Sequence, residues 1–197
     1  MSGKVKLVRG FKANAEKLAK EYRNVLGKNV QDPLCAFELA NHLNISIYTP
    51  AEIFSAASSE HQFSGANNEI FGWSALTMTT GNNNKIIIHN NFHSSTRQQS
   101  NIMHELAHII CDHKYADDRL LNIPIGMRDY NPVFEEEANC LGSTIQLPRE
   151  GLIWAKKKNL TNLEISQIFN ASLEMINYRL RISGVLRQFS HYKKSDL

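Results

Sequence analysis

The N-terminal part of the chain has apolar residues at helical spacing. Between residues 11 and 26, apolar side chains recur every three or four positions, which predicts an amphipathic helix with one buried face. Gly27 is expected to end this helix. Asp32 followed by Pro33 is typical of a helix start, so a second helix is predicted from there. The β-branched sequence ISIY, residues 45–48, then predicts a short strand.

The middle of the chain has the pattern of short strands followed by a helix. The sequence FGWSALTMTT predicts one or two strands, and GNNN at residues 81–84 predicts a turn before a further strand, KIIIHN. After these strands, Ile102, Leu106 and Ile109 fall on one face of a helix. This helix is therefore expected to be largely buried and to end near Asp112.

The helices that follow are indicated by capping residues. Asn131 followed by Pro132 predicts the start of a helix that Pro148 would close. Together, the elements predict an α+β fold in which a small, mainly antiparallel sheet packs with helices. We expect a first domain over residues 1–148 and a helical segment over residues 149–197 that packs on it.

The C-terminal segment has the pattern of two short helices joined by a tight turn. Thr161 and Glu164 form a capping box before the first helix, Ser172 is expected to cap the second, and Gly184 is expected to end it. Asn170 lies in the turn, where a left-handed backbone conformation is needed. The pair is helix-turn-helix-like, but the second helix begins with Leu-Glu-Met, which is poorly suited to DNA phosphates. A packing or partner-docking role is therefore favoured over DNA binding.

The composition indicates an ordinary globular protein. A length of 197 residues allows one domain with a substantial core, and 42% hydrophobic with 21% charged residues excludes disordered and fibrous classes. Neither a signal peptide nor an apolar run long enough to span a membrane is recognisable, so we expect a cytoplasmic protein without membrane contact. The three cysteines form no CxxC pair, which argues against a disulfide framework and against a Cys-type zinc site.

The positive charge is concentrated at the C-terminus. The whole chain has a net charge of +3, but residues 1–148 carry 13 Lys and Arg against 15 Asp and Glu, whereas residues 149–197 carry 9 against 4. An excess of this size is more commonly a solvated basic face than a nucleic-acid-binding surface. Charge alone therefore does not identify a DNA-binding protein.

The sequence HELAH, with His104, Glu105 and His108, is the strongest candidate for a metal site. Residues four apart on a helix share one face, so the two imidazoles can point at one ion. On an apolar helix, two uncoordinated histidines would each need a separate hydrogen-bond partner, whereas a shared metal ion accounts for both. Catalytic zinc needs a third protein ligand, and residues 135–137 offer three glutamates. An acidic first turn is also favoured by the helix dipole, and only one of the three can be the ligand.

Two stretches of sequence resemble a known family. RQQSNIMHELAHIICDH followed by EEEANCLGSTIQLP is similar to the ImmA/IrrE family of metallopeptidases, whose pattern is an HExxH helix followed by an ExxAN helix. The resemblance implies a zincin-like arrangement around the HExxH helix and a gluzincin-type Zn²⁺ site. In that site Glu135 would be the third ligand beside His104 and His108. It further implies that Asn139 hydrogen-bonds a ligand histidine.

The same resemblance implies an activity. Glu105 would take a proton from a water molecule that attacks a peptide carbonyl polarised by the metal, so that a protein substrate is hydrolysed. The substrate implied is narrow, typically an Xre-type transcriptional repressor with its own helix-turn-helix, in mobile-element or stress regulation. The alternative is a non-catalytic regulator with a structural metal, in which the C-terminal helices bind DNA or a protein partner. An intact HExxH favours the enzyme, because a structural site has no need of Glu105.

Several further residues could contribute to the site. Three histidines flank the motif: His89, His93 and His113. A single histidine is more often a structural residue than a functional one, so no role is assigned to any of them. Tyr130 could stabilise an oxyanion, and Arg97 matches a basic residue common before the HExxH helix of the family, although a surface charge explains Arg97 equally well.

Overall fold

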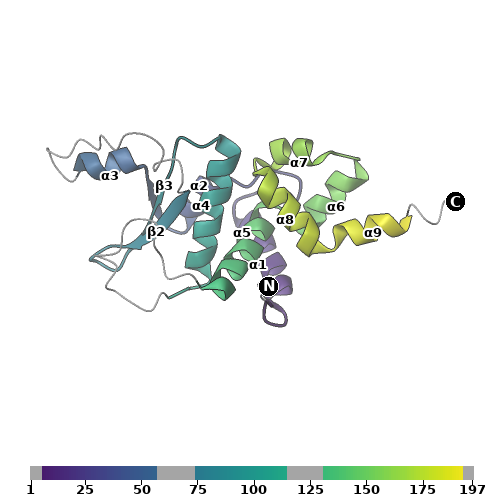
Figure 1. Ribbon diagram of the computed structural model, residues 1–197, viewed down its shortest axis with the longest axis horizontal. Coiled ribbons are helices and arrows are strands. Elements are labelled where there is room, and N and C mark those ends of the chain that lie inside the picture. Colours follow the sequence, from purple (N-terminus) through teal and green to yellow (C-terminus); the bar gives the residue numbers. More distant parts are fainter. Residues whose placement is uncertain (1–5, 57–73, 115–130, 193–197) are drawn as a thin grey trace.

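The computed structural model describes residues 6–56, 74–114 and 131–192. The order of elements in these ranges is α1 (Phe11–Val25), α2 (Ala36–His42), β1 (Ser46–Tyr48), α3 (Pro50–Ala56), β2 (Ala75–Thr79), β3 (Lys85–His89), α4 (Ser95–Ile110), α5 (Pro132–Gln146), α6 (Arg149–Lys157), α7 (Asn162–Phe169), α8 (Leu173–Ser183) and α9 (Val185–Tyr192). Figure 1 shows the sheet and α3 at one end of the molecule, α6 to α9 at the other, and α4 and α5 between them. The predicted α+β class is confirmed. None of the helices in the described ranges is long and apolar enough to cross a membrane.

The sheet is small and mixed. Its order is β1-β3-β2, with β1 parallel to β3 and β2 antiparallel to β3, so that Ile87 at the centre pairs with Ile47 on one side and Thr77 on the other. The described strands thus form a mixed sheet, whose longer pairing is the expected antiparallel one and whose parallel pairing was not predicted. A tight turn joins β2 to β3, whereas the chain from β1 to β3 passes through α3 and β2, and only a long connection allows parallel pairing. The predicted turn at residues 81–84 is confirmed, with Asn83 in the left-handed region at φ 61°.

The larger core lies between the sheet and helices α1, α2, α4 and α5. It includes Ile87 of β3, Ile102 and Leu106 of α4, and Leu141 of α5, all at most 1% exposed. Helix α5 approaches the backbone of α4 closely at Gly142, where an added Cβ would lie 2.9 Å from the carbonyl oxygen of Met103. The lack of a side chain at Gly142 brings the two helices together beside His104.

A second core unites the C-terminal helices. It is formed by buried residues of the α5–α6 junction and of α6 to α9: Leu147, Leu152, Ala155, Ile165, Phe169, Ala171, Ile176, Leu180 and Val185. The local signals predicted for this segment are confirmed: the Thr161 and Glu164 capping box, the Ser172 cap, Asn170 in the left-handed region at φ 47°, and Gly184 ending α8 at φ 74°. Helix α9 was not predicted.

Two buried arginines hold the C-terminal end of α5. Arg23 of α1 donates to the carbonyl oxygens of Ile145 and Gln146, at 3.3 and 2.8 Å, and Arg179 of α8 donates to that of Leu147 at 2.8 Å. Both side chains are only 2% exposed. Arg179 also forms an ion pair with Glu16 of α1. Its charge is therefore used inside the protein, although its position in the sequence suggested a solvated basic residue.

One predicted helix boundary was wrong, and another lies close to its predicted position. Helix α2 begins at Ala36, three residues beyond Pro33, because the Asp32 carboxylate accepts hydrogen bonds from Asn29 in the preceding turn and does not cap a helix. The side chain of Gln99 on α4 accepts from the backbone N–H of Ala36 at 2.6 Å and replaces a local cap. Helix α4 ends at Ile110, slightly before Asp112, which adopts the left-handed region at φ 51°.

Candidate metal centre

Helices α4 and α5 bring the three predicted ligands together. The Nε2 atom of His104 lies 3.0 Å from Nε2 of His108 and 3.2 Å from Oε2 of Glu135, and Nε2 of His108 lies 3.5 Å from Oε1 of Glu135. The two histidines share a face of α4 because they are four residues apart. Glu135 lies in the first turn of α5, which begins where Asn131 accepts a hydrogen bond from the N–H of Val133 at 3.0 Å.

The donor set and its spacing fit a divalent metal ion. Two imidazole nitrogens and a carboxylate oxygen lie within 4.8 Å of one another, and these are the ligand types that zinc takes in proteins. Ligand atoms held about 2.0–2.1 Å from a tetrahedral ion are about 3.3–3.4 Å from one another. The observed separations of 3.0 to 3.5 Å are close to that value. His104 and Glu135 keep side-chain exposures of 23% and 25%, so the cluster is accessible from one side.

The three consecutive glutamates have three different partners. Glu135 faces the histidine pair, Glu136 accepts a hydrogen bond from the hydroxyl of Tyr178 at 3.0 Å, and Glu137 lies 3.0 Å from Nε2 of His113. Composition and spacing leave the choice among the three open, and only the family resemblance selects Glu135. In the structure, Glu135 alone of the three is grouped with His104 and His108.

The electrostatics of the cluster favour an ionised Glu135. Burial opposes ionisation and raises the pKa of this carboxyl, but hydrogen bonds and charges from His104 and His108 outweigh it. The pKa of Glu135 is therefore held well below its usual range. A carboxylate is the form in which glutamate binds a metal ion.

Glu105 lies outside the ligand cluster and is anchored separately. Glu105 is 5% exposed, and its Oε2 atom accepts a hydrogen bond of 2.7 Å from the hydroxyl of Thr77 on β2. Neighbouring residues on a helix point about 100° apart, which explains why Glu105 turns toward the edge strand while His104 faces α5. The structure thus provides a buried carboxylate that is not itself one of the clustered ligand atoms.

A third histidine and a second glutamate, both largely buried, extend the cluster. The Nδ1 atom of His108 lies 2.9 Å from Nδ1 of His113, whose other ring nitrogen faces Glu137. His113 stacks on Phe134 with ring centroids 4.4 Å apart and an interplanar angle of 7°. Asn139, expected from the resemblance to contact a ligand histidine, is exposed on α5, and His113 occupies that role at His108.

The remaining candidate residues do not join the cluster. His89 is 5% exposed at the end of β3 and packs edge-on against Phe37, with ring centroids 5.6 Å apart. Its pKa is lowered chiefly by burial. These properties are those of a structural histidine in the core. Arg97 is exposed on the first turn of α4, and His93 precedes that helix. Tyr130 lies outside the described residues.

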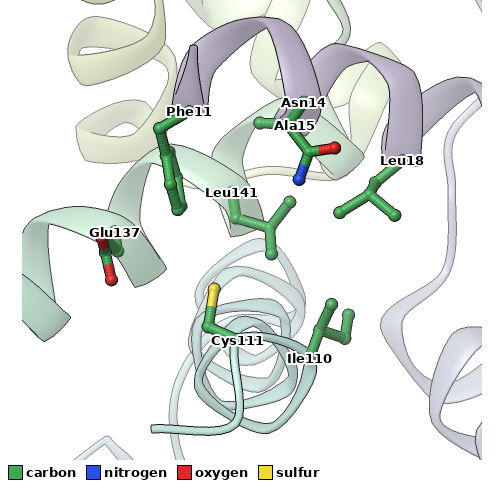
Figure 2. A pocket seen from close by; sticks show the side chains of 8 residues that line it. All are labelled: Phe11, Asn14, Ala15, Leu18, Ile110, Cys111, Glu137 and Leu141. Atoms are coloured by element: carbon green, nitrogen blue, oxygen red, sulfur yellow. The ribbon is translucent and has the colours of Figure 1, made fainter. Parts of the chain in front are cut away.

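A cavity of about 180 Å³ lies between α1, the C-terminal end of α4 and the middle of α5. Figure 2 shows Leu141 of α5 and Cys111, which follows α4, near its centre, with Glu137 at its edge. None of the three clustered ligands lines it. Burial raises the pKa of the Cys111 thiol to about 11, so the sulfur is a packing group and not a nucleophile.

Comparison with known proteins supports the interpretation of the site. A peptidase family model described as the IrrE N-terminal-like domain matches residues 40–181. The chain belongs to this family. The match runs from α2 into α8 and includes both helices that carry the clustered ligands, so the resemblance to ImmA/IrrE metallopeptidases is confirmed. The family is one of metal-dependent peptidases, and in this member the His104, His108 and Glu135 cluster could hold the metal. No curated protein and no solved structure matches the chain.

Proposed function

We propose that this IrrE-like protein is a zinc-dependent endopeptidase. His104, His108 and Glu135 would hold Zn²⁺, and Glu105 would act as general base. The observation that carries the proposal is the separation of two kinds of carboxylate: Glu135 belongs to the ligand cluster, whereas Glu105 is buried beside it with its own anchor on β2. A metal that only stabilised the fold would need the first and not the second.

The roles of the residues follow from their chemistry. When bound, the ion would supply Lewis-acid polarisation of the scissile carbonyl and lower the pKa of a water molecule. Glu105 would accept a proton as the water oxygen bonds to the carbonyl carbon, and would pass that proton to the leaving amide nitrogen as the peptide bond breaks. The hydroxyl of Thr77 donates to Oε2 of Glu105 and restricts how the carboxylate can turn.

The proposed substrate is a specific cytoplasmic protein, an Xre-type transcriptional repressor, cleaved in mobile-element or stress regulation. This part of the proposal rests on the resemblance to ImmA/IrrE proteins. The rival is a non-catalytic, metal-stabilised regulator that binds DNA or a protein partner through its C-terminal helices. Two features weaken its DNA-binding form: Arg179 is buried against Leu147 and Glu16, and the first turn of α8 carries Glu174 and exposed Leu173.

The decisive comparison is between cells that express the wild-type protein and cells that express Glu105→Gln. The substitution keeps the size of the side chain but removes the base, so we expect unchanged zinc content and a loss of cleavage of about two or more orders of magnitude. Proteome-wide mapping of new N-termini detects the cleavage whichever cellular protein is the substrate. Identical N-termini in both cells, with the wild-type protein fully loaded with zinc, would refute the peptidase and leave the regulator.

The ligand set is tested by metal analysis of three neighbouring variants. Glu135→Ala should lose the zinc, whereas Glu136→Ala should keep it because Glu136 bonds to Tyr178 and not to the histidines. Glu137→Ala should retain the ion with reduced affinity. Loss of zinc in Glu136→Ala together with retention in Glu135→Ala would show that the assignment is wrong.

A further inference from the structure

A chain of three hydrogen-bonding groups runs from the candidate metal centre into the protein. It starts at His108, continues through His113 and ends at Glu137, with heavy-atom separations of 2.9 and 3.0 Å. The side chains of the two histidines are 4% exposed and that of Glu137 is 16% exposed. Water therefore competes little for these contacts, and the direction of each hydrogen bond is set by the groups themselves.

The direction of the chain follows from its inner end. A carboxylate can only accept, so the Nε2 atom of His113 must carry a hydrogen and donate it to Glu137. The Nδ1 atom of the neutral His113 ring is then an acceptor, and Nδ1 of His108 must donate to it. The other nitrogen of His108, Nε2, is left with a lone pair, and it is this atom that lies 3.0 Å from Nε2 of His104 and 3.5 Å from Oε1 of Glu135.

The backbone is built to hold His113 in this place. Helix α4 ends at Ile110, and Asp112 enters the left-handed region at φ 51°, which turns the chain back on itself. The backbone N–H of His113 then donates to the carbonyl oxygen of His108 at 3.1 Å. The ring stacks flat on Phe134, the residue immediately before Glu135. The first two turns of α5 thus supply the third candidate ligand, the stacking surface and the acceptor that ends the chain.

We propose that His113 and Glu137 are positioning residues that select the Nδ1–H tautomer of His108 and fix the orientation of its ring, and that they thereby set the metal affinity of the centre. This inference rests on the proposed function in so far as the cluster binds Zn²⁺. Partners that hydrogen-bond the outer nitrogen of a metal-binding histidine typically contribute 10- to 100-fold in affinity. Neither residue belongs to the cluster of candidate ligands itself.

The experiment measures zinc affinity by competition with a chelator, and records the visible absorption spectrum of the Co²⁺-substituted protein. His113→Phe keeps an aromatic ring to stack on Phe134 but cannot accept from His108. We expect Zn²⁺ affinity to fall 10- to 100-fold and the Co²⁺ bands to shift, because the ring of His108 is no longer held in one orientation. A merely structural role for His113 would leave the Co²⁺ spectrum unchanged.

Glu137→Gln is the second test and Glu136→Gln its matched control. The amide keeps the volume of Glu137 but removes the charge and can also present a donor to His113, so affinity should fall, whereas the same change at Glu136 should leave it unchanged. If His113→Phe does not fold, this isosteric pair decides alone. The inference is overturned if both His113→Phe and Glu137→Gln keep wild-type zinc affinity and an unaltered Co²⁺ spectrum. If His113→Phe does not fold, the same result in Glu137→Gln alone overturns it. Either result leaves the proposed zinc site intact. A wild-type protein that binds no Zn²⁺ would overturn both.

Discussion

Replacing Gly142 by alanine should disturb the candidate metal centre without touching any proposed ligand. A Cβ at this position would lie 2.9 Å from the carbonyl oxygen of Met103, 3.2 Å from its carbonyl carbon and 3.3 Å from the Cα of His104. Carbon atoms in favourable contact are about 3.5–4.0 Å apart. All three neighbours are backbone atoms of α4, so no side chain can rotate out of the way. The two helices must therefore separate by a few tenths of an ångström beside His104.

The size of the effect follows from two opposing contributions. Overpacking of a closed interface costs about 1–3 kcal/mol. Alanine is about 1 kcal/mol more favourable than glycine inside a helix, which offsets part of that cost. The free energy of unfolding of the metal-free protein should therefore fall by about 0–2 kcal/mol. The helices would separate beside His104, which is a candidate ligand. Strain of about 1–2 kcal/mol in the ligand geometry would weaken metal binding about 5- to 30-fold.

Gly151→Ala is the matched control for this experiment. Its Cβ would lie 2.5 Å from the carbonyl oxygen of Val30 and 3.0 Å from the ring of Phe169, so it also collides with fixed neighbours, but in the second core. Urea unfolding of the metal-free proteins and zinc titration should show that Gly151→Ala loses stability and keeps metal affinity, whereas Gly142→Ala loses affinity. If Gly142→Ala binds zinc like the wild type and is no less stable, the close approach of α5 is not what sets the geometry of the site.

Two further predictions concern stability. Arg23→Met leaves the carbonyl oxygens of Ile145 and Gln146 without their donor, at a cost of about 1–3 kcal/mol for each buried group. The urea midpoint should therefore fall without a change in the slope of the unfolding free energy against urea. A midpoint equal to that of the wild type would contradict the capping role. Zn²⁺ at about a hundred times its dissociation constant should raise the free energy of unfolding by about 2.7 kcal/mol and thereby raise the melting temperature. Glu135→Ala should abolish this rise in melting temperature. An equal rise in that variant would place the stabilising ion elsewhere.

The features that the sequence predicts well are those whose causes are local. Asn131 caps α5 through bonds to N–H groups two and three residues away, and the Thr161 and Glu164 capping box closes within four residues. Asn170 adopts the left-handed region because asparagine tolerates it better than most side chains. In each case the partner lies within one turn of the chain, so residue type and spacing are sufficient.

The features that the sequence misses depend on partners far along the chain. The start of α2 is set by Gln99, 63 residues after Ala36, and the end of α5 by Arg23, more than 120 residues earlier. No spacing rule connects such residues. The parallel pairing of β1 with β3 is missed for a related reason, because apolar alternation specifies that a strand exists but not which neighbour it takes.

The candidate site likewise contains residues that local spacing predicts and residues that it does not. His104 and His108 are predictable because helical spacing alone puts them on one face. Choosing Glu135 among three consecutive glutamates required the family resemblance, since each of them could face the histidines until the rotation of α5 is known. His113 gave one usable signal: it follows the end of the metal-binding helix closely enough for the chain to fold back over the last turn.

Helix α5 connects these observations, because backbone groups at both of its ends have side-chain hydrogen-bond partners. Asn131 satisfies N–H groups at its start, where Glu135 faces the histidines, and Arg23 and Arg179 satisfy carbonyl groups at its end. Arg179 comes from beyond residue 148, the predicted domain boundary, and is itself paired with Glu16 of α1. The C-terminal helices therefore help to fix the axial position of the helix that carries the third candidate ligand. This gives them a structural reason to accompany the HExxH helix that does not depend on contact with DNA.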